Sequence, residues 1–164
     1  MNCFLDRDGI INQNIPYVGT KDRFTWCPFV SEIMRTLTLK GYKLIMITNQ
    51  SGINRGYYST SQFFDLSFFI INELASQGID IEINFCPHHP HENCKCRKPN
   101  PGMILRYKIS CDDIFIGDKE TDMMAAFNAG INHRWILAPQ PLGPYTKHFL
   151  NHNQLASYLK CYTS

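Results

Sequence analysis

Short apolar runs alternate along this chain with segments whose apolar residues recur every three or four positions. The apolar runs predict strands at residues 3–5, 44–47, 81–85, 114–116 and 135–137. The helical spacing predicts helices at residues 30–37, 59–76, 121–129 and 153–160. Because strands and helices alternate, we expect an α/β fold with a parallel sheet and right-handed crossovers.

Local signals mark where several of these elements begin and end. Gly41, Gly78 and Gly130 follow the first three predicted helices, where a glycine commonly ends a helix. Ser59 with Gln62 three positions later resembles a capping box and predicts the start of the second helix. Prolines at residues 139–144 break the pattern, so no further strand is predicted there.

Length and composition restrict the class of protein. With 164 residues, 44% hydrophobic and 18% charged, we expect a single domain spanning residues 1–164. A net charge of +2 gives no reason to expect a nucleic-acid or membrane partner. The chain has neither an apolar run long enough to span a bilayer nor a leader-like start, so a cytoplasmic location is expected.

Two carboxylates stand at the end of the first predicted strand. Asp6 and Asp8 are separated by one residue, directly after the apolar run at residues 3–5. Open α/β sheets bind ligands at the carboxyl edge of their strands, and two close carboxylates need a cation or a proton. Mg²⁺ prefers oxygen ligands, and an Asp carboxylate can attack phosphorus. The alternative is an ordinary polar turn after a strand.

Three more predicted strand ends carry polar groups. Residues 48–51 offer a hydroxyl and loop amides, Arg97 and Lys98 offer positive charge, and Asp118 offers another carboxylate. Each has a simpler reading as a turn, a surface pair or a helix cap. Because parallel strands end at the same edge, we expect all four segments to meet in one crevice.

Cysteine and histidine residues gather in a short stretch of the chain. Cys86, His88, Cys94 and Cys96 provide three thiols and an imidazole at a spacing that suits a tetrahedral Zn²⁺ site. With the carboxylates available for chemistry, we expect this zinc to be structural and to hold the loop at residues 86–96. Free cysteines beside incidental histidines are the alternative.

Four segments, in this order, resemble the haloacid dehalogenase-like phosphatase superfamily. They are LDRDGIIN at residues 5–12, ITNQSGINRGYY at 47–58, CPHHPHENCKCRKPNPGM at 86–103 and IGDKETDMMAAFNAGI at 116–131. The most similar branch contains heptose-bisphosphate and histidinol-phosphate phosphatases. The resemblance implies a Rossmann-like parallel sheet with helices on both faces, no cap domain and a zinc-binding loop.

The resemblance also implies catalytic roles. Asp6 is the expected nucleophile and Asp8 the general acid and base, while Lys98 stabilises the transferred charge. Magnesium is expected on Asp6, on Asp8 through its main-chain carbonyl, and on Asp118. Asp122 is expected to orient Lys98 or water, or else to be an ordinary helix residue.

Binding roles follow from the same resemblance. The expected substrate contacts are Thr48, Asn49, Gln50, Ser51, Arg97 and Lys119. Arg55 is a further candidate for a second phosphate, with solvent exposure as its alternative. We expect a small sugar phosphate as the substrate and a monomeric protein.

The two kinds of enzyme in this branch predict different substrates. Residues 49–58 and 97–103 resemble enzymes that remove the phosphate at position 7 of D-glycero-D-manno-heptose 1,7-bisphosphate, which is the favoured prediction. Only five residues separate His88 from Cys94, as in histidinol-phosphate phosphatases. A zinc-stabilised binding module without activity is the alternative from another class.

Overall fold

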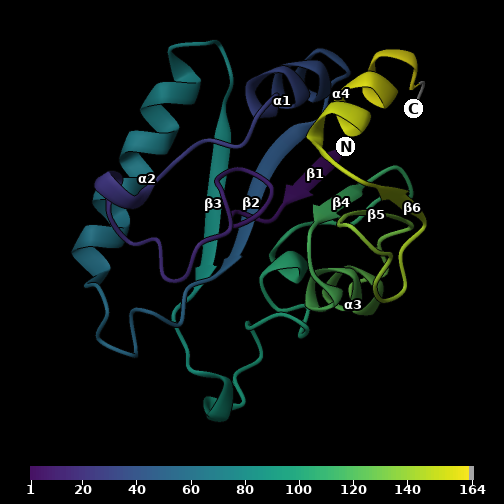
Figure 1. Ribbon diagram of the computed structural model, residues 1–164. Helices are drawn as coiled ribbons and strands as arrows, with labels where there is room; N and C mark the ends of the chain where they lie inside the picture. Colours follow the sequence, from purple (N-terminus) through teal and green to yellow (C-terminus); the bar gives the residue numbers. More distant parts are fainter. Residues whose placement is uncertain (163–164) are drawn as a thin grey trace.

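Six parallel strands in the order β3-β2-β1-β4-β5-β6 form one sheet in the computed structural model, which describes residues 1–162 (Figure 1). The strands are β1 (Asn2–Leu5), β2 (Lys43–Asn49), β3 (Ile81–Cys86), β4 (Ile114–Gly117), β5 (His133–Leu137) and β6 (Lys147–Phe149). The α-helices are α1 (Val30–Leu39), α2 (Thr60–Ala75), α3 (Glu120–Asn128) and α4 (His152–Cys161). The expected α/β fold with a parallel sheet is confirmed.

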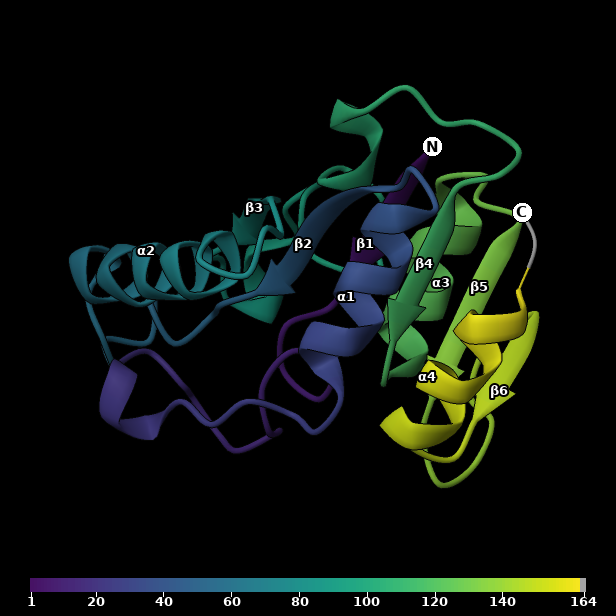
Figure 2. The same cartoon turned by 90° about the horizontal axis from the view of Figure 1, so that it is seen from above.

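Helices cover both faces of this sheet. One apolar cluster joins β1, β2 and β5 to buried residues of α1, α2 and α4. A second cluster, on the opposite side, joins the alternate strand residues to α3. Figure 2 shows α1 and α4 on the near side of the sheet and α3 on its far side. The central strands β1, β2 and β4 are therefore buried from both sides, which explains why they read as continuous apolar runs.

The sheet order places β1 between β2 and β4. Leu5, the last residue of β1, pairs with Met46 and with Ile116, and the amide of the next residue, Asp6, donates to Ile116 O at 2.9 Å. Since all strands are parallel, their carboxyl ends share one edge. Three adjacent strands therefore deliver the segments around Asp6, Asn49 and Asp118 to a single place.

Most helix signals in the sequence are confirmed. Ser59 accepts a hydrogen bond from the Gln62 amide and Gln62 returns one, which is the expected capping box of α2. Gly41, Gly78 and Gly130 all have positive φ beyond helix ends, a conformation that glycine adopts readily. Helix α4 begins at His152, one residue earlier than expected, with Asn151 as its cap.

The strand β6 was not predicted. It follows the proline-rich stretch, pairs with β5 at the edge of the sheet and contains only three residues. Three residues are too few to show the alternation that identifies a strand. Three short 3-10 helices, η1 (Lys21–Arg23), η2 (Pro90–Glu92) and η3 (Ile104–Arg106), were also missed for lack of a periodic pattern.

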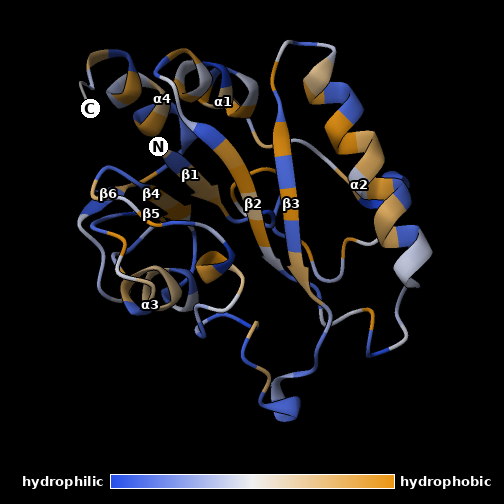
Figure 3. Cartoon of the chain, turned by 180° about the vertical axis from the view of Figure 1, so that it is seen from behind, coloured by the Kyte–Doolittle hydropathy of each residue, from blue (hydrophilic) through white to orange (hydrophobic). Residues whose placement is uncertain are grey.

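The connections at the carboxyl edge are loops. Residues 6–29 contain only η1 as regular structure, and residues 50–59 contain none, so the described residues include no cap domain over the sheet. Figure 3 shows apolar residues along β2, in alternation with polar ones on β3, and on α2, whereas the loop containing η2, at the bottom of the view, is hydrophilic. Among residues 1–162, no helix has the length and apolar character needed to cross a bilayer.

Candidate active site

The buried ion pair of Asp6 and Lys98 lies at the carboxyl edge of the sheet. Asp6 follows β1 directly and is 4% exposed, and Lys98 is 3% exposed. Lys98 Nζ donates to Asp6 Oδ1 at 2.6 Å and to the carbonyl oxygen of Ile47 at 2.8 Å. These bonds fix the ammonium group between the ends of β1 and β2.

Asn49 holds the backbone of Lys98 in place. Asn49 Oδ1 accepts from the Lys98 amide, and Asn49 Nδ2 donates to the Lys98 carbonyl, both at 3.1 Å. The Asn49 side chain, at the end of β2, thus makes a pair of hydrogen bonds with the Lys98 backbone like the pair that joins two neighbouring strands. This pairing explains how a residue from a loop is placed as firmly as one from a strand.

Asp122 completes the environment of Lys98. Its Oδ1 lies 2.6 Å from Lys98 Nζ, and its Oδ2 accepts from the amides of Asp118 and Lys119 at 3.2 and 3.0 Å. Asp122 therefore both closes the first turn of α3 and orients the lysine. The ordinary-helix-residue alternative does not account for this buried contact.

Asp118 follows β4 and faces the loop after β1. Its Oδ2 accepts from Asn14 Nδ2 at 2.8 Å, while its buried Oδ1 has no hydrogen-bond partner in the described residues. A Cβ built on Gly9, whose φ is +100°, would lie 2.2 Å from Asp118 Oδ2. Glycine at this position is what allows the carboxylate to lie against the loop.

The three carboxylates carry more negative charge than the lysine balances. Burial, with Asp122 beside it, raises the pKa of Asp6 to about 8, and Lys98 offsets only part of this. Burial also raises the pKa of Asp118 to about 6, against the effect of Lys119. Burial alone would lower the pKa of Lys98, but Asp122 and Asp6 raise it above its usual value.

This donor set fits a divalent cation. One carboxylate oxygen from each of Asp6, Asp118 and Asp122 lies within 4.8 Å of the others. The unpartnered Asp118 Oδ1 is the free ligand atom that a hard cation needs, and oxygen is the donor that Mg²⁺ prefers. Since Asp122 is held by Lys98 and two amides, Asp6 and Asp118 are the better side-chain ligands.

The Asp8 carboxylate lies beside this cluster and is held from several sides. Arg7 donates to both of its oxygens at 2.9 to 3.2 Å, Asn12 Nδ2 to Oδ1 at 3.0 Å, and Gln50 Nε2 to Oδ2 at 3.0 Å. Arg7 is 1% exposed and also donates to the carbonyl of Val18 at 2.6 Å. Arg7 is therefore an organising residue of the site.

Two adjoining hollows open over these groups. The inner hollow, about 340 Å³, is lined by Asp6, Asp8, Asn49, Arg97, Lys98, Lys119, Thr121 and Asp122. The outer hollow, about 360 Å³, shares Asp8, Asn49 and Lys119 with it and adds residues 14–18, Gln50, Ser51 and Tyr58 among others. Candidates expected from four distant segments of the sequence thus line two hollows that share three residues.

Two of the predicted contacts are engaged within the protein. Thr48 is fully buried, lines neither hollow, and its hydroxyl accepts from Gln50 Nε2 at 2.6 Å. Gln50 is 2% exposed; its Nε2 donates to Thr48 and Asp8, and its Oε1 accepts from Tyr58. Direct substrate contact by either side chain remains a prediction.

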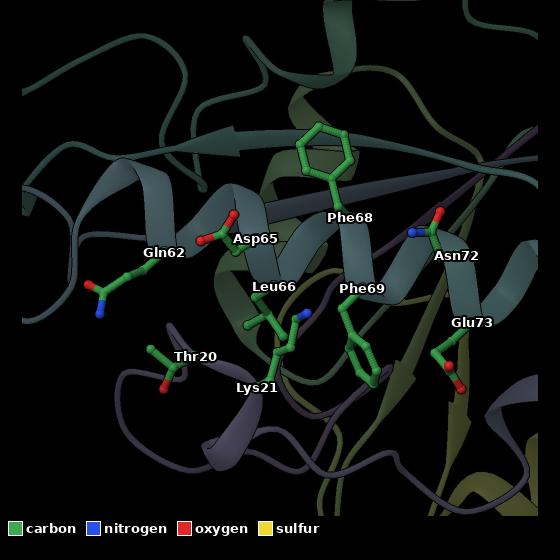
Figure 4. A pocket seen from close by; sticks show the side chains of 9 residues that line it. All are labelled: Thr20, Lys21, Gln62, Asp65, Leu66, Phe68, Phe69, Asn72 and Glu73. Carbon is green, nitrogen blue, oxygen red and sulfur yellow. The ribbon is translucent and has the colours of Figure 1, made fainter.

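A larger hollow lies elsewhere, at the side of α2. It measures about 640 Å³ and lies between α2 and the segment that contains η1 (Figure 4). Figure 4 shows Lys21 and Phe69 near each other, and the Lys21 ammonium is 5.4 Å from that ring. None of the buried carboxylates lines this groove, so size alone does not identify the reactive site.

The four predicted zinc ligands meet at the end of β3. Cys86 is its last residue, and the donor atoms of Cys86, His88, Cys94 and Cys96 lie within 4.8 Å of one another. Five of their pairs are 3.2 to 3.5 Å apart. A tetrahedral zinc with bonds of about 2.3 Å gives edges of about 3.8 Å, so the set fits this ion.

Comparison with known proteins identifies the family. The model of a family described as polynucleotide kinase 3 phosphatase matches residues 5–133. A Helicobacter pylori D-glycero-beta-D-manno-heptose-1,7-bisphosphate 7-phosphatase is 44% identical over 85% of this chain and 84% of its own length. The chain belongs to the haloacid dehalogenase-like phosphatases.

Two further comparisons extend the match over nearly the whole chain. A Campylobacter jejuni D-glycero-alpha-D-manno-heptose-1,7-bisphosphate 7-phosphatase is 40% identical over 96% of this chain and 94% of its own length. The crystal structure of a D,D-heptose 1,7-bisphosphate phosphatase from B. bronchiseptica, complexed with magnesium and phosphate, has a TM-score of 0.87. It is 29% identical and covers 98% of this chain and 99% of its own.

Some contacts of this phosphatase site were absent from the sequence-based predictions. Thr121 lines the inner hollow, and Asn14 binds Asp118 from the loop after β1. Thr121 stands inside the fourth matching segment, which is a signal that could have been used. Asn14 lies in an aperiodic loop, and no pattern in the sequence indicates that it contacts a residue 104 positions away.

Proposed function

We propose that this chain is a magnesium-dependent phosphomonoester hydrolase acting through an aspartyl-phosphate on Asp6. Its proposed substrate is D-glycero-D-manno-heptose 1,7-bisphosphate, from which it removes the phosphate at position 7. The observation that carries the proposal is the Lys98–Asp6 contact of 2.6 Å, buried among Asp118 and Asp122 at the floor of the inner hollow. A lysine and three carboxylates in this arrangement suit phosphoryl transfer.

In the first step, a carboxylate oxygen of Asp6 attacks phosphorus and the ester bond to the sugar oxygen breaks. Asp8 gives its proton to that departing oxygen, so the sugar leaves as an alcohol. Lys98 fixes the Asp6 carboxylate and supplies positive charge where charge accumulates on the phosphoryl oxygens. Burial of this ammonium strengthens its electrostatic effect because little water screens it.

In the second step, Asp8 takes a proton from a water molecule, which attacks the phosphorus of the aspartyl-phosphate. The bond between phosphorus and the Asp6 oxygen breaks, and phosphate and the free carboxylate are formed. Asp6, Asp118 and the main-chain carbonyl of Asp8 would hold Mg²⁺. When bound, the ion supplies positive charge that neutralises the phosphoryl oxygens and the carboxylates.

The proposed zinc site has a structural role. Cys96 stands two residues before Lys98, and Arg97 between them donates to the carbonyl of His88 at 3.3 Å. Fixing the four ligands therefore fixes the loop that delivers Arg97 and Lys98 to the site. Thiolate and imidazole donors favour Zn²⁺ over Mg²⁺. We therefore expect Zn²⁺ at the cysteine and histidine cluster and Mg²⁺ at the carboxylates.

The proposed contacts for the rest of the substrate are Arg97, Lys119, Ser51 and Asn49, which line the hollows. Arg97 and Lys119 would place two positive charges near the nucleophile, which suits a substrate with a second phosphate. The names of the relatives support heptose bisphosphate and divide between the alpha and beta anomers. Histidinol phosphate is the second candidate, because the stretch between His88 and Cys94 is short.

Phosphate release from a panel of esters tests this proposal. The panel contains both anomers of the heptose bisphosphate, histidinol phosphate and an oligonucleotide with a 3′-phosphate. We expect the highest kcat/KM with a heptose bisphosphate, and expect Asp6→Asn to abolish turnover of every ester. A preference for histidinol phosphate overturns the substrate, and undiminished activity of Asp6→Asn overturns the mechanism.

A further inference from the structure

The aromatic ring of Tyr58 lies between two loops that border the outer hollow. A Cβ built on Gly19 would lie 2.1 Å from the ring, and one built on Gly52 would lie 2.3 Å from it. Both loops therefore pack their backbones against Tyr58, which is 6% exposed and lies two residues before α2. The ring therefore holds both loops in place at the border of the outer hollow.

The hydroxyl of Tyr58 is connected to Asp8 through one residue. Tyr58 donates to Gln50 Oε1 at 2.5 Å, and Gln50 Nε2 donates to Asp8 Oδ2 at 3.0 Å. In this arrangement the Gln50 amide turns its nitrogen toward Asp8 and its oxygen toward Tyr58. The tyrosine hydroxyl therefore holds the oxygen of this amide in place, which keeps its nitrogen against Asp8.

The opposite side of Asp8 is connected to the same loop that contacts the ring. Arg7 binds both Asp8 oxygens and donates to the carbonyl of Val18, the residue before Gly19. The Asp8 carboxylate is thus held between two buried paths, one through Gln50 and one through Arg7. Both paths end in the loops packed on Tyr58.

We propose that Tyr58 is a positioning residue for Asp8, holding its carboxylate, through Gln50, where it can protonate the departing alcohol. The inference rests on the proposed role of Asp8. Tyr58 contacts no reacting atom. It connects the position of Asp8 to that of the two loops that border the leaving group. Displacing a catalytic group by about 1 Å can reduce a rate about 100-fold, so a small change in Gln50 is measurable.

The experiment compares kcat/KM for a poor and a good leaving group. Glycerol phosphate releases an alcohol that needs a proton, whereas 4-nitrophenyl phosphate releases a stable phenolate that does not. For Tyr58→Phe we expect about a tenfold loss with glycerol phosphate and less than about a twofold change with 4-nitrophenyl phosphate. The phenylalanine keeps the ring between the two glycines, so folding is retained.

A matched control is Tyr107→Phe. Its hydroxyl also makes hydrogen bonds, with Asn84 and Glu82 on β3, but it lines neither hollow. We expect it to leave both substrates unaffected. Gln50→Met, which removes the amide and keeps the length of the side chain, should show the same selective loss as Tyr58→Phe even if that variant folds poorly.

The outcomes separate this inference from the proposed function. Asp8→Asn is the reference, and its kcat/KM should fall for glycerol phosphate and change little for 4-nitrophenyl phosphate, because kcat/KM reports the steps up to departure of the leaving group. Loss of the base of the second step should lower kcat for both esters. If Asp8→Asn shows no such selectivity, the proposed role of Asp8 fails. If Asp8→Asn is selective but Tyr58→Phe and Gln50→Met lose both substrates equally, or lose neither, the positioning role alone is overturned.

Discussion

The side-chain nitrogen of Lys98 lies 2.6 Å from Asp6 Oδ1, although 92 positions separate the two residues in the chain. The contact exists because β1 and β2 are adjacent and Asn49 ties the segment of Lys98 to the end of β2. Asp122, from α3, approaches the same nitrogen from the other side. One buried ammonium group thus joins three separate parts of the chain.

Lys98→Met should abolish most activity, because it leaves Asp6 and Asp122 facing each other without a positive charge. We expect kcat/KM for phosphate ester hydrolysis to fall about 100-fold or more. Steady-state phosphate release measures this, and circular dichroism checks that the variant is folded. Lys160→Met, at an exposed lysine of α4, should behave as the parent. Parent-like rates for Lys98→Met would refute this role.

Asp118→Asn should remove the stabilisation that magnesium gives. A ligand present at 100 times its Kd stabilises the folded state by about 2.7 kcal/mol. For a chain of this length, that corresponds to roughly 5 to 10 °C in Tm. We expect the parent to show a rise of this kind on adding Mg²⁺ in thermal denaturation and Asp118→Asn to show almost none.

The matched control for this measurement is Asp112→Asn. Asp112 is exposed in the turn before β4 and is not one of the clustered carboxylates. Its magnesium response should equal that of the parent. An equal response from Asp118→Asn would mean that Asp118 does not hold the ion.

Cys94→Ser should release the zinc and loosen the loop that carries Lys98. A structural zinc contributes directly to folding, so we expect about one zinc per chain in the parent, none in the variant, and a lower Tm. Elemental analysis of the purified chains measures the metal content. Cys111→Ser, at an exposed cysteine outside the cluster, should keep the ion. A full zinc content in Cys94→Ser would contradict the assignment.

Much of the fold was readable from the sequence because the central strands are buried on both faces and helix ends carry local signals. The apolar runs at β1, β2 and β4 located the three strand ends that meet at the site. The edge strand β6 escaped notice because its three residues carry no detectable period. Its pairing with β5 is a tertiary event that no local pattern records.

The site also contains residues whose positions could be predicted from the sequence and residues whose positions could not. The sequence placed Asp6 and Asp118 at strand ends, and their convergence follows from parallel topology. Lys98 lies in the loop after β3, and its position depends on the hydrogen bonds of Asn49. The contact of Gly9 with Asp118 and the bonds that hold Asp8 depend on how aperiodic loops fold over one another. Periodicity carries no information about such loops, so the positions of Asn14 and Tyr58 could only be read from the structure.

His152 makes stability depend on pH below neutrality. Burial lowers its pKa from the usual 6.5, against the hydrogen bond with the carbonyl of Ile10 at 2.9 Å. Above about pH 6.5 the ring is neutral in the folded and unfolded states. As pH falls below this value, the unfolded chain binds the proton more readily, so the free energy of unfolding decreases.

His152→Gln should therefore lose less stability than the parent when the pH falls from about 7 to about 5. Urea denaturation at several pH values measures the difference between the two slopes. His133→Gln, on β5, is the control, and its slope should follow that of the parent. If the parent and His152→Gln lose stability in parallel, the buried imidazole does not bring about the pH dependence, and the carboxylates of the site become its source.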